Sequence, residues 1–164
     1  MNTIESKFKV GEHIGGIVAH VFETMLTLSA LPAPAAKLPH DRVSGAIGIA
    51  GDHVIGTVYL HFPDPLAREV TRAMLQSPPD QAVSDSDVND VIGEMSNMIG
   101  CRLKSLLNDA DIFCAVSTPS VIRGAFAVEA PQGVRAEVFY FNCLGQRLAV
   151  EVHLQISDAT GASI

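Results

Sequence analysis

The C-terminal part of the chain holds two strand-like runs separated by a tight turn, and this pair limits the fold more than any other feature. VRAEVFYFNC (134–143) and QRLAVEVHLQI (146–156) both alternate apolar with polar residues, and only Leu144-Gly145 separates them. Such a two-residue connection is typical of an antiparallel β-hairpin. Because a lone hairpin is unstable in water, further strands or helices must cover one of its faces.

Other segments supply those strands. SGAIGIAGDHVIGTVYLHF (44–62) reads as a second hairpin with Gly51-Asp52 at its turn, and IFCAVSTPSVI (112–122) and GAFAVEA (124–130) also have the character of strands. We find no internal repeat and no low-complexity segment. The strands therefore predict one sheet that is mostly antiparallel.

Three stretches have helical spacing of their apolar residues. They are residues 11–30, a segment that Pro63 and Pro65 open and SPPDQ closes, and residues 88–107, while the proline-rich LPAPAAKLP (31–39) ends the first of them. The order of elements predicts an α+β fold, with long helices packed on one face of the sheet. The length of 164 residues with 48% hydrophobic content suits a single domain, 1–164.

Composition argues against several classes of partner. The formal net charge is −7, from 11 Lys+Arg against 18 Asp+Glu, and no basic cluster or tryptophan is present, so we expect no nucleic-acid partner. No apolar run approaches the ~20 residues that span a bilayer, and no signal-peptide pattern opens the chain. Three scattered cysteines without CxxC spacing fit a reducing compartment. We expect a cytoplasmic protein with no membrane partner.

Common catalytic and metal-binding patterns find no support. The six histidines form no HExxH motif and no i, i+4 pair, so we interpret them as surface or structural residues. There is no GxSxG elbow, and the glycines between 45 and 56 suit a tightly packed hairpin better than a phosphate-binding loop. No local pattern supports a catalytic Cys/His pair.

The third helix, VNDVIGEMSNMIGCRLKSLL (88–107), carries the most informative pattern. We expect its core face to hold Val88, Ile92, Met95, Ile99, Leu103 and Leu106. The opposite face carries a row of polar residues at three- and four-residue spacing: Asp90, Glu94, Asn97 and Cys101.

Val91 and Met98 lie on the border of this row, and Ser84, Asp85 or Ser86 can each cap the helix. Arg102 falls on the apolar side, which the helical pattern does not explain. The row is either an ordinary solvated face or a surface that docks another protein. Asn97 favours docking, because asparagine is a poor helix former and a mid-helix position needs a reason.

The segment DVIGEMSNMIG resembles the characteristic helix of the CheC/CheX/FliY family of chemotaxis phosphatases. The family pattern Asp-x-x-x-Glu-x-x-Asn falls on Asp90, Glu94 and Asn97. VFETMLTL (21–28), GIAGDHVIGTVYLHF (48–62) and STPSVIRG (117–124) resemble the CheX branch in the same order, and the single copy of the helix is similar to CheX rather than CheC. The family often reads Asn-Met-Ile-Ala-Gly, whereas here Gly100 comes one place earlier and Cys101 follows.

The resemblance implies a function. Members remove phosphate from the aspartyl phosphate of a CheY-type response regulator, in chemotaxis or related two-component signalling. It implies that Asn97 positions the attacking water and that Glu94 clamps a lysine of the regulator. Asp90, Val91, Met98 and Cys101 would then bind the partner. The protein would need no cofactor of its own, since the regulator supplies Mg²⁺, and it would form a homodimer through its sheet.

Two other interpretations stay open on the sequence. The first is a non-catalytic module that binds a response regulator or a flagellar switch component; the Glu94/Asn97 pair argues for the enzyme, because a binding module has no need of the amide. The second and weaker is an unrelated α+β ligand-binding domain, for which the strands supply no converging polar groups. Cys101 is either a redox-active residue or a small packing residue, and we favour packing.

Overall fold

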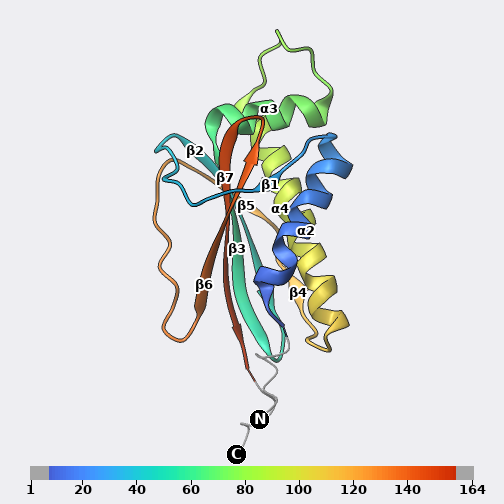
Figure 1. The fold of residues 1–164 in the computed structure, drawn as a ribbon, viewed down its shortest axis with the longest axis vertical. Helices are drawn as coiled ribbons and strands as arrows, with labels where there is room; N and C mark the ends of the chain where they lie inside the picture. The colour runs from blue at the N-terminus through green and yellow to red at the C-terminus, as the bar shows by residue number, and fades with distance from the viewer. Residues whose placement is uncertain (1–7, 158–164) are drawn as a thin grey trace, which may run out of the picture.

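The computed structural model describes residues 8–157, and these form helices on one side of an antiparallel sheet (Figure 1). The helices are α2 (Val10–Leu26), α3 (Asp64–Leu75) and α4 (Asp85–Asp109). The strands are β1 (Leu31–Pro32), β2 (Arg42–Ala50), β3 (Val54–Pro63), β4 (Ala115–Val116), β5 (Ser120–Arg123), β6 (Arg135–Cys143) and β7 (Gln146–Ile156).

All strands belong to one seven-stranded sheet in the order β1-β6-β7-β3-β2-β4, with β5 also paired to β2. Both predicted hairpins are present: β2 pairs with β3 along its whole length, and β6 pairs with β7 from Arg135 opposite Leu154 to Cys143 opposite Gln146. Every pairing is antiparallel. The predicted α+β fold is confirmed.

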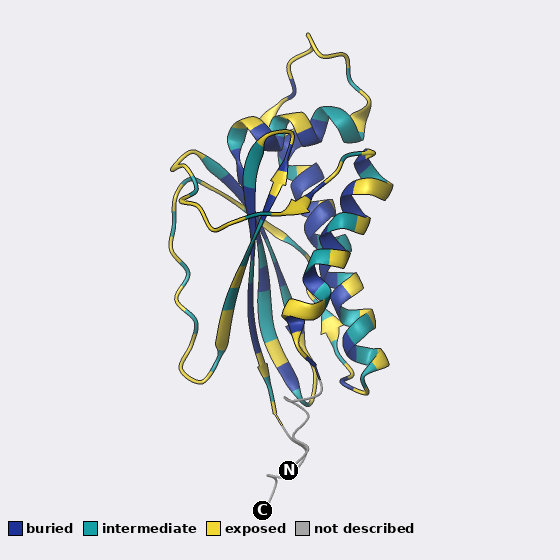
Figure 2. Ribbon diagram, in the orientation of Figure 1, coloured by how far each residue is buried: buried dark blue, intermediate teal, exposed yellow. Residues whose placement is uncertain are grey.

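The core lies between the helices and one face of the sheet. In Figure 1, α2 and α4 cover this face and α3 lies across one end, while the buried residues of Figure 2 line the space between them. Leu148, Val150 and Val152 of β7 are each at most 1% exposed. Burial of each such large side chain contributes about 1.5–3 kcal/mol to stability. The alternation of β7 therefore gives the sheet its helix-facing side.

The prediction of a strand over GAFAVEA (124–130) is wrong. This segment leaves the sheet edge at Gly124, whose positive φ of 98° turns the chain away from β2. It then crosses the face of the sheet that the helices do not cover (Figure 1). The Arg42 guanidinium holds it there by donating to the Phe126 carbonyl and lying 5.6 Å from the Phe126 ring centroid.

Two boundaries also differ from expectation. The first helix ends at Leu26 rather than near residue 30, because Thr27 adopts a left-handed conformation and its N–H donates to the carbonyl of Glu23. The proline-rich segment after it contributes the short strand β1, where Leu31 lies opposite Asn142. None of the helices within residues 8–157 is long and apolar enough to cross a membrane.

Candidate functional site

The polar row lies on α4, and the helix begins at a well-formed cap. Ser84 is the N-cap: its hydroxyl accepts a hydrogen bond from the Asp87 N–H at 3.0 Å, and the Asp87 carboxylate accepts from the Ser84 N–H at 3.2 Å. This reciprocal capping box satisfies two backbone donors that otherwise lack partners. Of the three cap candidates in the sequence, the structure selects the first.

Arginines from neighbouring elements hold the N-terminal half of α4. Arg68 of α3 bridges Asp64 at 2.9 Å and Asp85 at 2.7 Å, and its hydrogen bond lowers the pKa of the Asp85 carboxyl. Arg123 of β5 donates to the side chain of Asn89 at 3.0 Å. These contacts tie the first turns of α4 to α3 and to the edge of the sheet, directly before Asp90.

The middle of α4 lies unusually close to β2. A methyl group on Gly45 would overlap the Ser96 hydroxyl, and one on Gly100 would come within 2.8 Å of Ile47 Cδ1. Gly45, Ser96 and Gly100 are all buried, and the Ser96 hydroxyl donates to the Ile92 carbonyl. The early glycine that departs from the family pattern therefore serves the contact between α4 and Ile47.

The row occupies the side of α4 that faces away from the sheet. Asp90 and Glu94 are exposed, while Asn97 and Cys101 are half-buried. Neither carboxylate makes a hydrogen bond or ion pair within residues 8–157. The one side-chain hydrogen bond of Asn97 among these residues comes from the Cys101 thiol, which donates to Asn97 Oδ1 over 3.8 Å. The structure thus presents two unpaired carboxylates and an amide on one ridge, as the helical spacing predicts.

The expectation for Val91 is wrong. Its side chain is only 4% exposed and belongs to the hydrophobic core, so it has little surface to offer a partner. The reason is that α2 and α3 both pack against α4 and extend the buried face beyond what a single helix predicts. Met98, on the same flank, is half-buried and packs partly against the core.

Two cations that flank the row were not among the predicted site residues. Arg102 is exposed and lines a groove between α4 and α2, which explains why it can stand on the apolar side of the helical pattern. Lys104 follows Cys101 by three residues and Asn97 by seven, so it continues the row itself. Extending the same spacing by one step in the sequence would have found Lys104.

Polar side chains also gather on the opposite face of the sheet. The Ser44 hydroxyl lies 2.7 Å from His61 Nδ1, and the Glu151 carboxylate accepts from His61 Nε2 at 3.0 Å and from His153 Nε2 at 2.7 Å. The His61 hydrogen bond is the largest cause that lowers the pKa of Glu151, and burial opposes it. Both histidines are buried and bonded, which agrees with their structural interpretation.

This network resembles a hydrolase triad in its order of groups, but its serine cannot reach a substrate. Ser44 has no exposed surface, and the segment from Gly124 onward passes over this face with Phe126 against His61 at 5.7 Å between ring centroids. Within residues 8–157, no three His, Cys, Asp or Glu side chains are grouped to hold a metal ion. The network is best explained as a bonded polar layer under the crossing segment.

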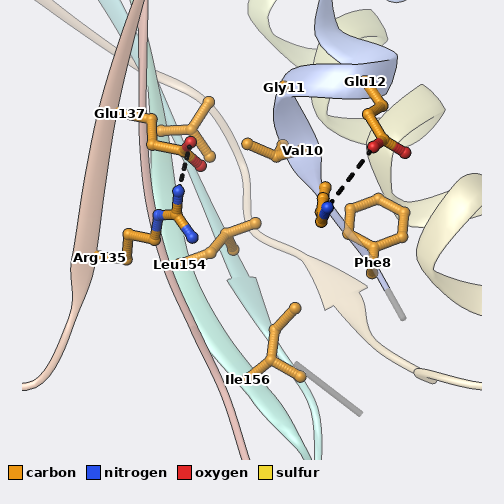
Figure 3. Close-up of a pocket in the computed structure, with 10 residues that line it drawn as sticks. Phe8, Val10, Gly11, Glu12, Arg135, Glu137, Leu154 and Ile156 are labelled. Carbon is orange, nitrogen blue, oxygen red and sulfur yellow. Dashed lines mark hydrogen bonds and ion pairs between the residues drawn. The ribbon is translucent and has the colours of Figure 1, made fainter. Parts of the chain in front are cut away.

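A cavity of about 300 Å³ opens at the start of α2, and Figure 3 shows its lining. Its floor is apolar, with Val10 and Leu154 among its residues. The charges on its rim are paired with each other, Lys9 with Glu12 at 3.9 Å and Arg135 with Glu137 at 3.2 Å. No residue of the polar row lines it, so the row and not this cavity is the candidate site.

The amide and the carboxylates of the row can orient a partner and a water molecule, while its one thiol, Cys101, is half-buried and donates to Asn97. An amide oxygen accepts a hydrogen from water and the amide nitrogen donates, without adding charge beside an anionic group. A carboxylate three residues earlier lies one turn away on the same ridge and suits a cation of a docked protein. These properties fit a reaction whose activated group is brought by the partner.

Comparison with known proteins identifies the fold family. A family model described as chemotaxis phosphatase CheX matches residues 43–142, which include the whole of α4. The chemotaxis protein CheX from Vibrio vulnificus is similar in structure at a TM-score of 0.77 and 22% identity, covering 91% of this chain and 98% of that one. No sequence among curated proteins matches significantly.

Two further crystal structures have the same fold. CheX from Desulfovibrio desulfuricans has a TM-score of 0.76 at 24% identity, covering 90% of this chain and 100% of that one. The CheX–CheY–BeF3–Mg²⁺ complex from Borrelia burgdorferi has a TM-score of 0.71 at 19% identity, covering 90% and 98%. The family model spans more than half of the sequence, and the chain therefore belongs to the chemotaxis phosphatase CheX family.

Proposed function

We propose that this protein hydrolyses the aspartyl phosphate of a CheY-type response regulator. The observation that carries the proposal is the unpaired Glu94 and the accessible Asn97 amide on one exposed ridge of α4. Membership of the CheX family supports the reaction class, and the relative from Borrelia burgdorferi crystallised with CheY supports the kind of partner.

In the proposed reaction a water oxygen attacks the phosphorus in line with the bond to the aspartate oxygen, that bond breaks, and the regulator's aspartate leaves as a carboxylate. Both protons of the water end on the released inorganic phosphate. Asn97 holds the water through its amide oxygen, and positioning of this kind accounts for the rate gain without a base. The regulator supplies Mg²⁺ and a lysine, and Glu94 binds that lysine as a charge-assisted contact. The protein contributes no cofactor of its own.

The rest of the ridge forms the docking surface in this proposal. Asp90 extends the acidic end next to Glu94, and the exposed parts of Met98 and Cys101 border Asn97. A flexible methionine beside polar groups suits contact with another protein surface. Val91 has no part in it, because it is buried.

We further propose that two copies pair through the sheet. β1 pairs with β6 only at Asn142 and Phe141, so the outer edge of β6 from Arg135 to Phe139 has no strand partner within residues 8–157. An unpaired strand edge with an exposed apolar residue, here Val138 at 44%, readily accepts another strand. A second copy that adds its own β6 would satisfy both edges.

The test of the enzymatic proposal is the loss of radiolabelled phosphate from a CheY-type regulator with and without this protein. Faster loss in its presence is the expected result. A protein that binds the regulator without hastening the loss would instead be a non-catalytic binding module.

A further inference from the structure

The Cys101 thiol forms the one side-chain hydrogen bond of Asn97 among residues 8–157. Its Sγ atom lies 3.8 Å from Asn97 Oδ1, and a thiol donates over a longer distance than a hydroxyl because sulfur is the larger atom. Side chains of an α-helix lean toward its N-terminus, so the half-buried Cys101 side chain leans back over Asn97, four residues earlier. Helix geometry and the distance therefore agree on this contact.

The hydroxyl groups of the helices behave differently. Beyond the first turn of α2, α3 and α4, each hydroxyl donates to the backbone carbonyl four residues earlier, at 2.7 to 3.1 Å; the residues are Thr24, Thr71, Ser96 and Ser105. Such bonding back to the helix is a common choice of helical serine and threonine. The thiol of Cys101 donates to the Asn97 side chain instead. A cysteine at this position therefore makes a contact that a serine would direct to the backbone.

The orientation of the Asn97 amide matters because its two ends have opposite character. Oδ1 accepts a hydrogen from water, whereas Nδ2 only donates, so an amide turned by 180° offers the attacking water no acceptor. The torsion that exchanges the two ends is broad in asparagine and does not fix the orientation by itself. Among the described residues, the Cys101 contact is the hydrogen bond that distinguishes the two ends.

We propose that Cys101 is a positioning residue for the hydrolysis: its thiol holds Oδ1 of Asn97 and leaves the second lone pair of that oxygen for the attacking water. The inference rests on the proposed function. Cys101 acts through Asn97 and takes no part in the making or breaking of bonds. An amide that is oriented before the regulator docks does not have to be ordered during the reaction, and this raises the rate.

Two substitutions at Cys101 test the effect on the rate. Cys101→Ala removes the donor, and Cys101→Ser supplies a hydroxyl that we expect to bond to the Asn97 carbonyl instead of the amide. At saturating regulator, both variants should hydrolyse about three- to fivefold more slowly than the wild type, because each loses a weak hydrogen bond to the water-positioning group. Their affinity for the regulator loaded with beryllofluoride and Mg²⁺ should stay within about twofold of wild type, because the charges of the ridge are unchanged.

Ser105→Ala is the matched control for these rates. Ser105 is exposed, lies one turn beyond Cys101 on α4, and its hydroxyl donates to the Cys101 carbonyl at 3.1 Å. The substitution therefore removes a hydrogen bond of the same helix that does not reach Asn97. We expect it to keep the wild-type rate. A Cys101→Ala or Cys101→Ser variant that also keeps the wild-type rate overturns the inference.

Nuclear magnetic resonance relaxation of side-chain amides in the free protein separates positioning from packing. We expect the order parameter of the Asn97 Nδ2 group to fall by about 0.2 in Cys101→Ala and to stay unchanged in Ser105→Ala. Asn89 and Asn108 report on the two ends of α4, where their Oδ1 atoms accept from Arg123 and from the Cys114 N–H. Their order parameters should not change in any variant.

The relaxation experiment has two results that overturn the inference. One is an Asn97 order parameter that Cys101→Ala leaves unchanged, and the other is an equal fall at Asn89 and Asn108, which would show that the whole helix has loosened. If the wild type binds the regulator without hydrolysing its phosphate while the Asn97 order parameter falls as expected, the phosphatase proposal fails and the hold of Cys101 on the amide stands.

Discussion

The Sγ atom of Cys101 lies 3.8 Å from the Oδ1 atom of Asn97, one turn further along α4. An amide oxygen has two lone pairs, so a thiol that donates to one of them leaves the other for a water molecule. The contact also directs the Asn97 nitrogen away from Cys101. Cys101 thus packs against the amide and biases its orientation before any partner arrives.

Removal of the Glu94 charge should weaken docking rather than chemistry. For Glu94→Gln we expect about tenfold weaker binding of the beryllofluoride-loaded regulator at low salt, because a charge-assisted contact to lysine becomes a neutral one. Fluorescence anisotropy at two salt concentrations measures the affinity of each variant for the loaded regulator. Glu129→Gln, an exposed carboxylate in the segment on the other side of the sheet, is the matched control. Equal affinities for the two variants would remove Glu94 from the interface.

Two glycine substitutions should have opposite effects on the free energy of unfolding, because only Gly45 lies where β2 and α4 are in close contact. Gly45→Ala should lower the free energy of unfolding by about 1–3 kcal/mol, because the new methyl group overlaps Ser96. Gly15→Ala, at a helical position where the new methyl group would meet no atom from the rest of the fold within 4 Å, should raise it by up to about 1 kcal/mol. Urea unfolding measures both, and a neutral Gly45→Ala would show that α4 does not approach β2 so closely.

The lowered pKa of Glu151 predicts that the protein loses stability in acid. Its pKa is lowered by the His61 hydrogen bond, so the unfolded chain binds a proton at Glu151 before the folded one does. The stability that ionised Glu151 contributes is complete at a pH well above its ordinary pKa of 4.5. It is lost as the pH falls through the lower pKa of the folded state. We expect Glu151→Gln to flatten the decline of the unfolding free energy below pH 4.5. Glu129→Gln should keep the wild-type slope, and a Glu151→Gln slope equal to it would contradict the assignment.

The open edge of β6 predicts a dimer that a single charge disrupts. A lysine on an edge strand is a common device against strand pairing, so Val138→Lys should shift the protein toward monomer. Ile122→Lys places the same charge at an exposed apolar residue of β5, at the other edge of the sheet, and should leave the dimer intact. Sedimentation at several protein concentrations measures the proportions of dimer and monomer for each variant. A monomeric wild type, or equal effects of the two lysines, would remove β6 as the interface.

The elements that local chemistry specifies could be predicted from the sequence. The two long hairpins follow from alternation around short turns, and α4 follows from its cap and its apolar spacing. The segment after Gly124 was predicted as a strand because its residues favour strands, whereas its course depends on a turn and on the distant Arg42. Tertiary context of this kind is absent from a local pattern.

The sequence placed the polar row of the candidate site correctly but not all of the residues around it, for a related reason. Helical spacing places the row on one face, but only the family resemblance assigns roles to Glu94 and Asn97. Val91 was misplaced because a single helix does not reveal that two neighbours pack around it. That Arg102 and Lys104 pair with no carboxylate of residues 8–157 depends on where other elements place their acidic residues, which a helical pattern does not contain.

The most direct test of the account is the rate of phosphate loss from a CheY-type regulator with the wild type and with Asn97→Ala, beside the affinity of each for the beryllofluoride-loaded regulator. If Asn97 positions the water, the variant should lose about 100-fold of the acceleration. Its affinity should stay within about threefold of wild type, because the Glu94 contact and the rest of the ridge remain. An Asn97→Ala variant that hydrolyses as fast as the wild type would contradict the assignment of the water-positioning group.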